Sequence, residues 1–143
     1  MVKVRLFTSY FGNFRALQNE GVLMIGISRF PPKYFNGPTI FDLAPLASML
    51  KLPAEEYDKQ FAERVLGATN PKNIIKQIEW YAEKTQSTSI ALCCYEKEQK
   101  ECHRYNVALW LQEAGFEIEE FKVETKIEPE KPKVQDLQTS MFD

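Results

Sequence analysis

Apolar residues along this chain follow two patterns, which together predict alternating strands and helices. Two near-continuous apolar runs, GVLMIGIS at 21–28 and TSIALCCY at 88–95, are typical of strands buried on both faces of a parallel sheet. The alternation in VKVRLF at 2–7 predicts another strand, and FEIEEFKV at 116–123 predicts a strand at the sheet edge.

Between these strands, apolar residues recur at helical spacing. In the segment 69–86, Asn70 is placed to cap a helix and Pro71 suits its first turn. The segment 102–115 predicts a second helix that stops at Gly115. A short helix or turn is expected at 12–21, a short helix at 41–50 and a longer one at 53–67. The proline-rich RFPPKYFNGP at 29–38 predicts a long exposed loop.

This order of elements predicts an α/β fold: a small, mostly parallel sheet of about four strands flanked by helices, in a Rossmann-like three-layer arrangement. We expect a single domain over 1–123 and a flexible tail at 124–143, which is rich in charge and proline. In parallel sheets, ligands bind beyond the carboxyl ends of the strands. The residues expected to converge there are Ser9, Tyr10, Ser28, Arg29, Cys94, Glu96, Cys102, His103 and Arg104.

Composition narrows the class of protein. The chain has 143 residues, of which 44% are hydrophobic, as is ordinary for a globular protein. Neither a membrane-spanning run nor a secretory signal is recognisable, so we expect no membrane association. Three cysteines, an odd number, do not suggest a disulfide framework, and a reduced cytoplasmic location is expected.

Charge is distributed unevenly. Residues 1–53 carry six basic and two acidic side chains, so this segment is +4 while the whole chain is −2. Aromatic residues are interleaved with the basic ones, a combination that suits phosphates and bases. The alternative is that most of these rings belong to the core.

All three cysteines and the only histidine fall within ten or so residues of one another. Structural zinc normally takes four ligands. Because Cys93 and Cys94 are neighbours on a predicted strand and face opposite ways, only Cys94, Cys102 and His103 remain. We therefore expect neither a metal nor another cofactor. A redox pair of Cys94 and Cys102 stays open, although no compact C-x-x-C motif is present.

The position of these residues favours a functional site. Cys102, His103 and Arg104 fall at the first turn of a predicted helix, where free N–H groups attract anions and favour a thiolate. Cys102 suits a nucleophile, with His103 or Glu96 as acid or base. Arg104, together with Arg29, suits a phosphate or carboxylate. The alternative is a helix start with a buried cysteine and a histidine satisfied by local hydrogen bonds.

The segment ALCCYEKEQKECHRYNVALWL at 91–111 resembles the L-C-[FY]-E…C-H-R…A-x-W-L signature of the domain of unknown function 488 family. TSYFGN and GISRFPPKYFNGP, followed by Leu43-Ala44-Pro45, resemble the subgroup of that family with an ISR-x-P-P segment. The resemblance covers about 4–123, with an extra Cys93 as one departure. It implies a compact α/β domain and no established activity. Its matches fall on Ser9, Tyr10, Ser28, Arg29, Pro31, Pro32, Cys94, Glu96, Cys102, His103 and Arg104.

The C-terminal QTSMF at 138–142 resembles the pentapeptide that binds the bacterial sliding clamp. Gln138 would be the polar anchor, and Met141 and Phe142 would fill an apolar pocket. The alternative is a latch in which Met141 and Phe142 fold back onto the domain.

Two hypotheses from different classes follow. The first is an enzyme in which a Cys–His–Arg centre, with Cys94 and Glu96 nearby, acts on a nucleotide or on a base in nucleic acid. The second is a nucleic-acid-associated adaptor without chemistry, which binds a ligand in the same crevice and docks through its tail.

Overall fold

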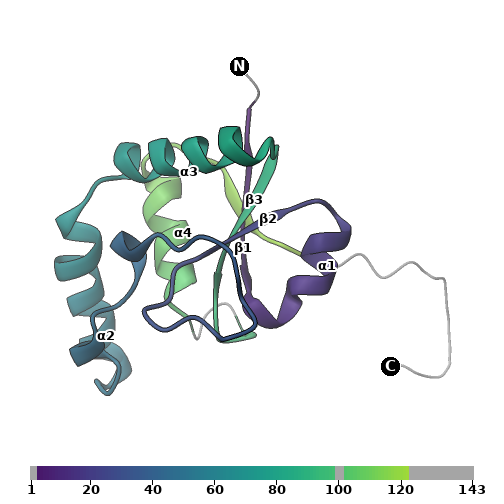
Figure 1. Cartoon of the computed structure of the whole chain (residues 1–143). Coiled ribbons are helices and arrows are strands. Elements are labelled where there is room, and N and C mark those ends of the chain that lie inside the picture. The colour runs from purple at the N-terminus through teal and green to yellow at the C-terminus, as the bar shows by residue number, and fades with distance from the viewer. Residues whose placement is uncertain (1–2, 99–101, 123–143) are drawn as a thin grey trace, which may run out of the picture.

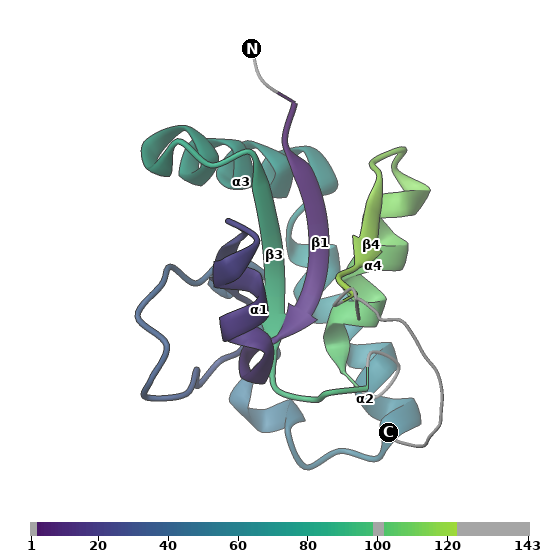
Figure 2. The same cartoon turned by 90° about the vertical axis from the view of Figure 1, so that its right-hand side faces the viewer.

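The computed structural model describes residues 3–98 and 102–122, and its centre is a four-stranded sheet (Figures 1 and 2). The strands are β1 (Arg5–Tyr10), β2 (Leu23–Gly26), β3 (Ser89–Cys94) and β4 (Ile118–Glu120). Their order is β2-β3-β1-β4, and every pairing is parallel. The predicted α/β class is therefore confirmed, and β4 lies at the sheet edge, as its alternating pattern predicted.

Helices cover both faces of this sheet. The α-helices are α1 (Phe14–Asn19), α2 (Ala54–Gln60), α3 (Pro71–Thr85) and α4 (His103–Glu113). A short 3₁₀ helix, η1 (Phe11–Asn13), precedes α1, which packs through Leu17 against one face. Helices α3 and α4 pack against the other face, so the molecule has three layers (Figure 1).

The two neighbouring cysteines of β3 show how the strand divides its side chains. Cys93 belongs to the core on the α1 side, and Cys94 belongs to the larger core on the α4 side. Successive side chains of a strand point to opposite faces. Cys94 is thus directed toward the start of α4, where Cys102 lies.

Three predicted elements differ from the sequence pattern. The first strand spans β1 rather than 2–7, because its pairing with β3 continues to the register pair Tyr10–Cys94. The segment 41–50 forms two 3₁₀ turns, η2 (Phe41–Leu43) and η3 (Ala47–Met49), in place of one helix. Pro45 separates them, since it lacks an N–H and holds Ala44 in an extended conformation.

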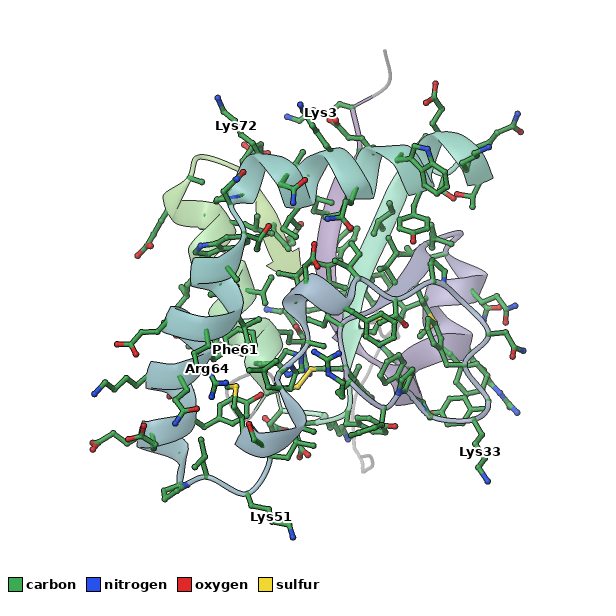
Figure 3. All side chains as sticks on the ribbon, turned by 60° about the vertical axis from the view of Figure 1, so that its left-hand side comes forward. Lys3, Lys33, Lys51, Phe61, Arg64 and Lys72 are labelled. Atoms are coloured by element: carbon green, nitrogen blue, oxygen red, sulfur yellow. A yellow bond between two sulfur atoms is a disulfide. The ribbon has the colours of Figure 1, made fainter. Side chains whose placement is uncertain are left out.

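The predicted helix at 53–67 is not uniform either. Helix α2 passes into a π-helical segment, η4 (Phe61–Val65), and then into a 3₁₀ turn, η5 (Leu66–Ala68). Phe61 in η4 is fully buried, whereas Arg64 is exposed (Figure 3). Irregular turns of this kind often occur where a helix passes a functional site.

The start of α3 follows the sequence closely. Asn70 Oδ1 accepts a hydrogen bond from the Asn73 N–H at 2.9 Å, and Pro71 occupies the first helical position. The loop 29–38 contains neither helix nor strand, as its prolines predicted. Within the described part of the chain, no helix has the length and apolar character needed to cross a bilayer.

Candidate functional site

A pocket of about 710 Å³ opens at the carboxyl edge of the sheet. Its walls come from the loop after β2, the segment after β3, the first turn of α4, and α2. It is lined by Ser28, Arg29, Phe30, Pro45, Leu50, Leu52, Ala54, Tyr57, Asp58, Tyr95, Glu96, Cys102, His103, Tyr105 and Asn106. Five of the nine residues expected to converge therefore share one pocket.

The four other expected residues lie behind or beside this pocket. Cys94 is fully buried and is joined to Cys102, and Arg104 is fully buried behind Cys94. Ser9 is buried and accepts a hydrogen bond from Asn13 Nδ2 at 3.2 Å. The Tyr10 ring lies 6.0 Å from the Arg104 guanidinium carbon. The structure thus separates a pocket wall from a buried layer that supports it.

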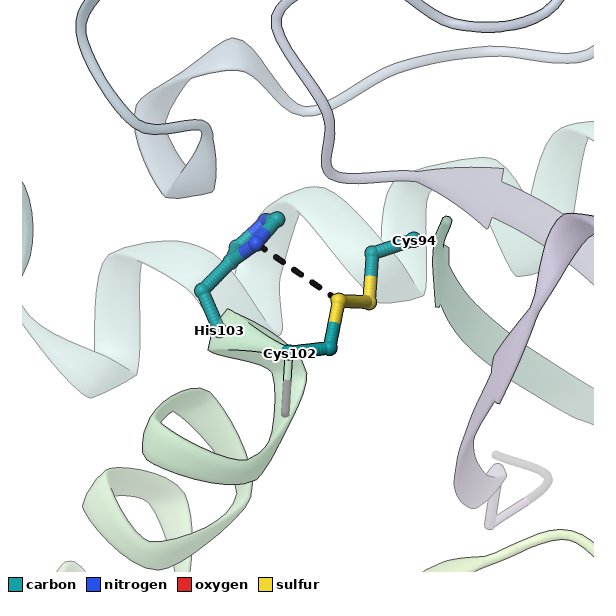
Figure 4. Close-up of side chains that lie close together, drawn as sticks. All are labelled: Cys94, Cys102 and His103. Carbon is teal, nitrogen blue, oxygen red and sulfur yellow. Dashed lines mark hydrogen bonds between the residues drawn. A yellow bond between two sulfur atoms is a disulfide. The ribbon is translucent and has the colours of Figure 1, made fainter. Parts of the chain in front are cut away.

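A disulfide joins Cys94 at the end of β3 to Cys102 at the N-cap of α4 (Figure 4). The two Cα atoms are 6.9 Å apart. The two sulfurs have different surroundings, because Cys94 is fully buried whereas Cys102 is half-buried and forms part of the pocket wall.

The imidazole of His103 is oriented by the end of β2. Its Nε2 donates a hydrogen bond to the Ile27 carbonyl oxygen, so Nδ1 is the unprotonated nitrogen of the neutral ring. Nδ1 lies 3.8 Å from Cys102 Sγ (Figure 4). Burial, and secondarily the nearby Arg104 charge, lower the pKa of His103 to about 4, against the opposing effect of the Ile27 hydrogen bond. His103 is therefore neutral at pH 7, with a lone pair facing a sulfur.

Helix α2 forms one wall of the pocket, and Phe61 of the π-helical segment packs behind it against His103. The Phe61 ring lies 5.4 Å from the imidazole, and the Tyr57 ring stacks on Phe61 at 6.0 Å. Burial raises the pKa of Tyr57 to about 12, and the neighbouring Asp58 carboxylate adds to this. Asp58 Oδ1 also accepts a hydrogen bond from Asn106 Nδ2 at 3.2 Å, which ties α2 to α4.

The guanidinium of Arg104 uses all five of its N–H groups within the protein. Nε and Nη2 donate to the two carboxylate oxygens of Glu120, at 3.0 and 2.9 Å. Nη1 donates to Cys94 Sγ at 3.2 Å and to the Glu96 carbonyl, and Nη2 also donates to the Lys97 carbonyl at 2.9 Å. Anion binding by Arg104 stays a prediction and requires one of these partners to leave. The geometry favours a positioning role for Arg104.

Arg29 is the basic residue that reaches the pocket itself. Its Nε donates to the Pro45 carbonyl at 3.0 Å and its Nη2 to the Ala44 carbonyl at 3.5 Å. Among residues 3–98 and 102–122, no acceptor bonds to its Nη1. Arg29 is thus held in place with a donor group left for a ligand.

Sequence reasoning missed four residues of this site. Glu120 falls within the predicted edge strand, and no local signal marks it as the partner of Arg104. Tyr57, Asp58 and Asn106 lie on helices whose neighbours the sequence could not establish, so no local signal marked them.

The cysteine–histidine cluster also has the ligand types of a metal site. The ligand atoms of Cys94, Cys102 and His103 lie within 4.8 Å of one another. Two features disfavour a cation here: the two sulfurs are bonded to each other, and the Arg104 guanidinium donates to Cys94 Sγ.

A larger cavity of about 850 Å³ opens at the amino edge of the sheet. Its rim carries two exposed ion pairs, Lys3–Glu117 and Arg5–Glu119, and its lining contains neither cysteine nor histidine. The cysteine and histidine side chains that line a pocket therefore lie at the carboxyl edge of the sheet. The sliding-clamp-like residues Gln138, Met141 and Phe142 fall outside the described residues.

Fold and site together define a small parallel α/β protein with a cysteine–histidine pair at the carboxyl edge of its sheet. The chain belongs to the DUF488-N3a family, whose model, described as "Active DUF488-N3 subclade", matches residues 13–115. The predicted membership of the domain of unknown function 488 family is thereby confirmed. No curated protein and no solved structure matches the chain.

Proposed function

We propose that the pocket is the active site of an enzyme that uses Cys102 as a nucleophile on a nucleotide or on a base in nucleic acid. The observation that carries this proposal is the pairing of Cys102 Sγ with the unprotonated Nδ1 of His103, at 3.8 Å, on the wall of a 710 Å³ pocket. A nucleophile beside an oriented base is the arrangement that covalent catalysis requires.

In the reduced protein, the Cys102 thiol can donate its hydrogen to His103 Nδ1. Because burial disfavours the imidazolium, we expect a neutral thiol at rest, which loses its proton to Nδ1 as the sulfur attacks. The resulting imidazolium is a stronger acid than an ordinary one, because burial lowers its pKa, and it can return the proton to a leaving group. Glu96, which is exposed at the pocket, is a second group able to transfer protons.

The pocket lining supports a nucleotide-like ligand. The rings of Phe30, Tyr57, Tyr95 and Tyr105 offer flat surfaces for a base, and Arg29 offers its Nη1 to a phosphate. Ser28 at the end of β2 adds a hydroxyl to the same wall. The Arg29 guanidinium and several aromatic rings therefore line the same pocket. The sequence showed only that basic and aromatic residues are interleaved in 1–53.

The proposal is tested with the full-length protein under reducing conditions, using a panel of nucleotides and single-stranded oligonucleotides and detecting products by mass. Cys102→Ser should lower kcat by at least about two orders of magnitude, as expected for loss of a nucleophile, while ligand binding persists. Cys93→Ala is the matched control, because Cys93 faces the opposite core and should leave turnover unchanged. Wild-type turnover in Cys102→Ser would exclude Cys102 as the nucleophile.

A non-catalytic nucleic-acid adaptor is the second candidate, and the donor left on Arg29 supports it whether or not the cysteines react. It predicts that Arg29→Ala weakens oligonucleotide binding and reduces the salt slope by about one, as for a lost phosphate contact. It also predicts that Cys102→Ser binds like the wild type and that no product forms with any ligand. Docking to a sliding clamp through 138–142, and a cytoplasmic location, belong to this proposal as well.

A further inference from the structure

We infer that Cys94 and Cys102 form a reversible dithiol–disulfide couple that exchanges with external thiols, with Cys102 as the attacked sulfur and Cys94 as the buried leaving group. This inference does not depend on the enzyme activity proposed above. It rests on three observations: a disulfide joins Cys94 and Cys102, only one of the two sulfurs is accessible, and each has a different polar partner.

Accessibility decides which sulfur is attacked. Cys94 has no exposed surface and lies between the sheet and α4, in the larger core cluster. Cys102 is half-buried and lines the pocket, which is large enough for a small thiol or the end of a thiol-bearing peptide. An incoming thiolate must approach the sulfur that it attacks, and only Cys102 offers an approach.

Electrostatics decide which sulfur leaves. The Arg104 guanidinium donates to Cys94 Sγ at 3.2 Å and is held there by Glu120 and by two backbone carbonyls. A thiolate released at Cys94 would therefore receive a charge-assisted hydrogen bond without any rearrangement. Glu120 partly offsets the arginine charge, but its carboxylate bonds to Nε and Nη2, whereas Nη1 faces the sulfur.

The exchange balances with thiols as the reductant. An external thiolate forms a sulfur–sulfur bond with Cys102, the Cys94–Cys102 bond breaks, and its electron pair stays on Cys94 as a thiolate. A second external thiolate then attacks the external sulfur of this mixed disulfide, and Cys102 leaves as a thiolate. The sum is protein disulfide plus two thiols giving protein dithiol plus one external disulfide. His103 Nδ1, at 3.8 Å, is placed to exchange the Cys102 proton.

Such a couple has a consequence for the site. In reducing compartments, disulfides are usually transient and catalytic or redox-sensing rather than structural. If the proposed nucleophilic function holds, the oxidised state has no free Cys102 thiol and is inactive. This last point alone rests on the proposed function.

The test uses full-length protein and glutathione disulfide as the probe. Cys94→Ser leaves Cys102 without its partner and should form a stable mixed disulfide with glutathione, seen by intact mass. Cys102→Ser, which keeps only the buried sulfurs of Cys93 and Cys94, should form the adduct many-fold more slowly. Cys93→Ala, the control, should form no stable adduct, because Cys94 displaces glutathione from Cys102.

The free thiols of the wild type are counted by alkylation after denaturation. We expect one free thiol in the oxidised protein and three in the reduced protein.

Three results would overturn the inference. Equal rates of adduct formation by Cys94→Ser and Cys102→Ser would show that Cys102 is no more accessible to thiols than Cys94. Three free thiols in every oxidising glutathione buffer would show that the pair does not bond. Stoichiometric zinc in the freshly purified protein, released together with two thiols, would assign the pair to a metal. None of these measurements uses a nucleotide. A negative result for the dithiol–disulfide couple therefore leaves the proposed enzyme function untouched, and the reverse also holds.

Discussion

At the scale of single residues, His103 carries the most information about the site. It is the only histidine of the chain, and the residue is 7% exposed. A buried imidazole with one nitrogen bonded to a carbonyl has its tautomer determined by that bond, here with Nε2 protonated. The same burial that makes His103 a base with a free lone pair makes it costly to protonate.

We therefore expect His103 to destabilise the protein at acid pH. Its pKa is about 4 in the folded state and near the ordinary 6.5 when unfolded. Between these values the unfolded state binds more protons, so the free energy of unfolding falls as the pH falls from 6.5 to 4. The loss is about 3 kcal/mol.

This loss can be measured by urea unfolding of the reduced protein between pH 7 and pH 4, for the wild type and for His103→Gln. The glutamine variant should show only the slope due to carboxylates. Parallel curves for the two proteins would mean that His103 titrates alike in the folded and unfolded states.

At the scale of secondary-structure elements, edge strand β4 completes the site from the side opposite the pocket. Glu119 and Glu120 are adjacent on this strand and have different surroundings. Glu119 pairs with Arg5 at 3.4 Å, and both side chains are mostly exposed. Glu120 pairs with the fully buried Arg104 and also accepts a hydrogen bond from Thr8 Oγ1 at 2.7 Å. One strand thus carries a surface ion pair and a buried one.

Glu120→Gln should therefore destabilise the fold far more than Glu119→Gln. Removing the Glu120 charge leaves the guanidinium of Arg104 buried with a neutral acceptor, which should cost about 2–4 kcal/mol. Glu119→Gln should cost less than about 0.5 kcal/mol, because its partner is solvated. Chemical denaturation of both variants measures the difference. Similar losses in the two would show that the Arg104–Glu120 pair contributes no more than a surface pair.

At the scale of the whole molecule, the positive charge of residues 1–53 does not form one surface. Lys3 lies at one end of the molecule, and Lys33 and Lys51 lie at the other (Figure 3). At the amino edge, Lys3 and Arg5 pair with acidic residues of the C-terminal part of the domain. The unevenness seen along the sequence is partly cancelled in space, and Arg29 is the basic residue of this segment that lines the pocket.

The tail supplies a whole-molecule prediction that rests on sequence alone. Full-length protein should bind a bacterial sliding clamp, and Met141→Ala/Phe142→Ala should weaken binding at least about tenfold, because two apolar side chains lose their burial. Thr139→Ala/Ser140→Ala is the matched control, since these are the free positions of the motif. Surface plasmon resonance on an immobilised clamp measures all three proteins. Equal binding by the wild type and the Met141/Phe142 variant would reject the motif.

The pattern of residues along the sequence was enough to predict the α/β class of fold. Buried strands and capped helices are marked by local composition. The apolar run GVLMIGIS predicted β2, and TSIALCCY predicted β3. The Asn70-Pro71 cap predicted the start of α3. The rule for parallel sheets then placed Ser28, Arg29, Glu96, Cys102 and His103 at one edge, and they line one pocket.

Only the tertiary structure decided what each of these residues touches. Arg104 was expected to face a ligand, yet its donors are directed to Glu120, Cys94 and the chain after β3. The pairing of Cys94 with Cys102 and the wall formed by Tyr57 likewise depend on how α4 and α2 pack. Some of these contacts are close in sequence, as Cys94 and Cys102 are only eight residues apart, but whether they form depends on how the elements pack in the core. Local patterns carry no record of them.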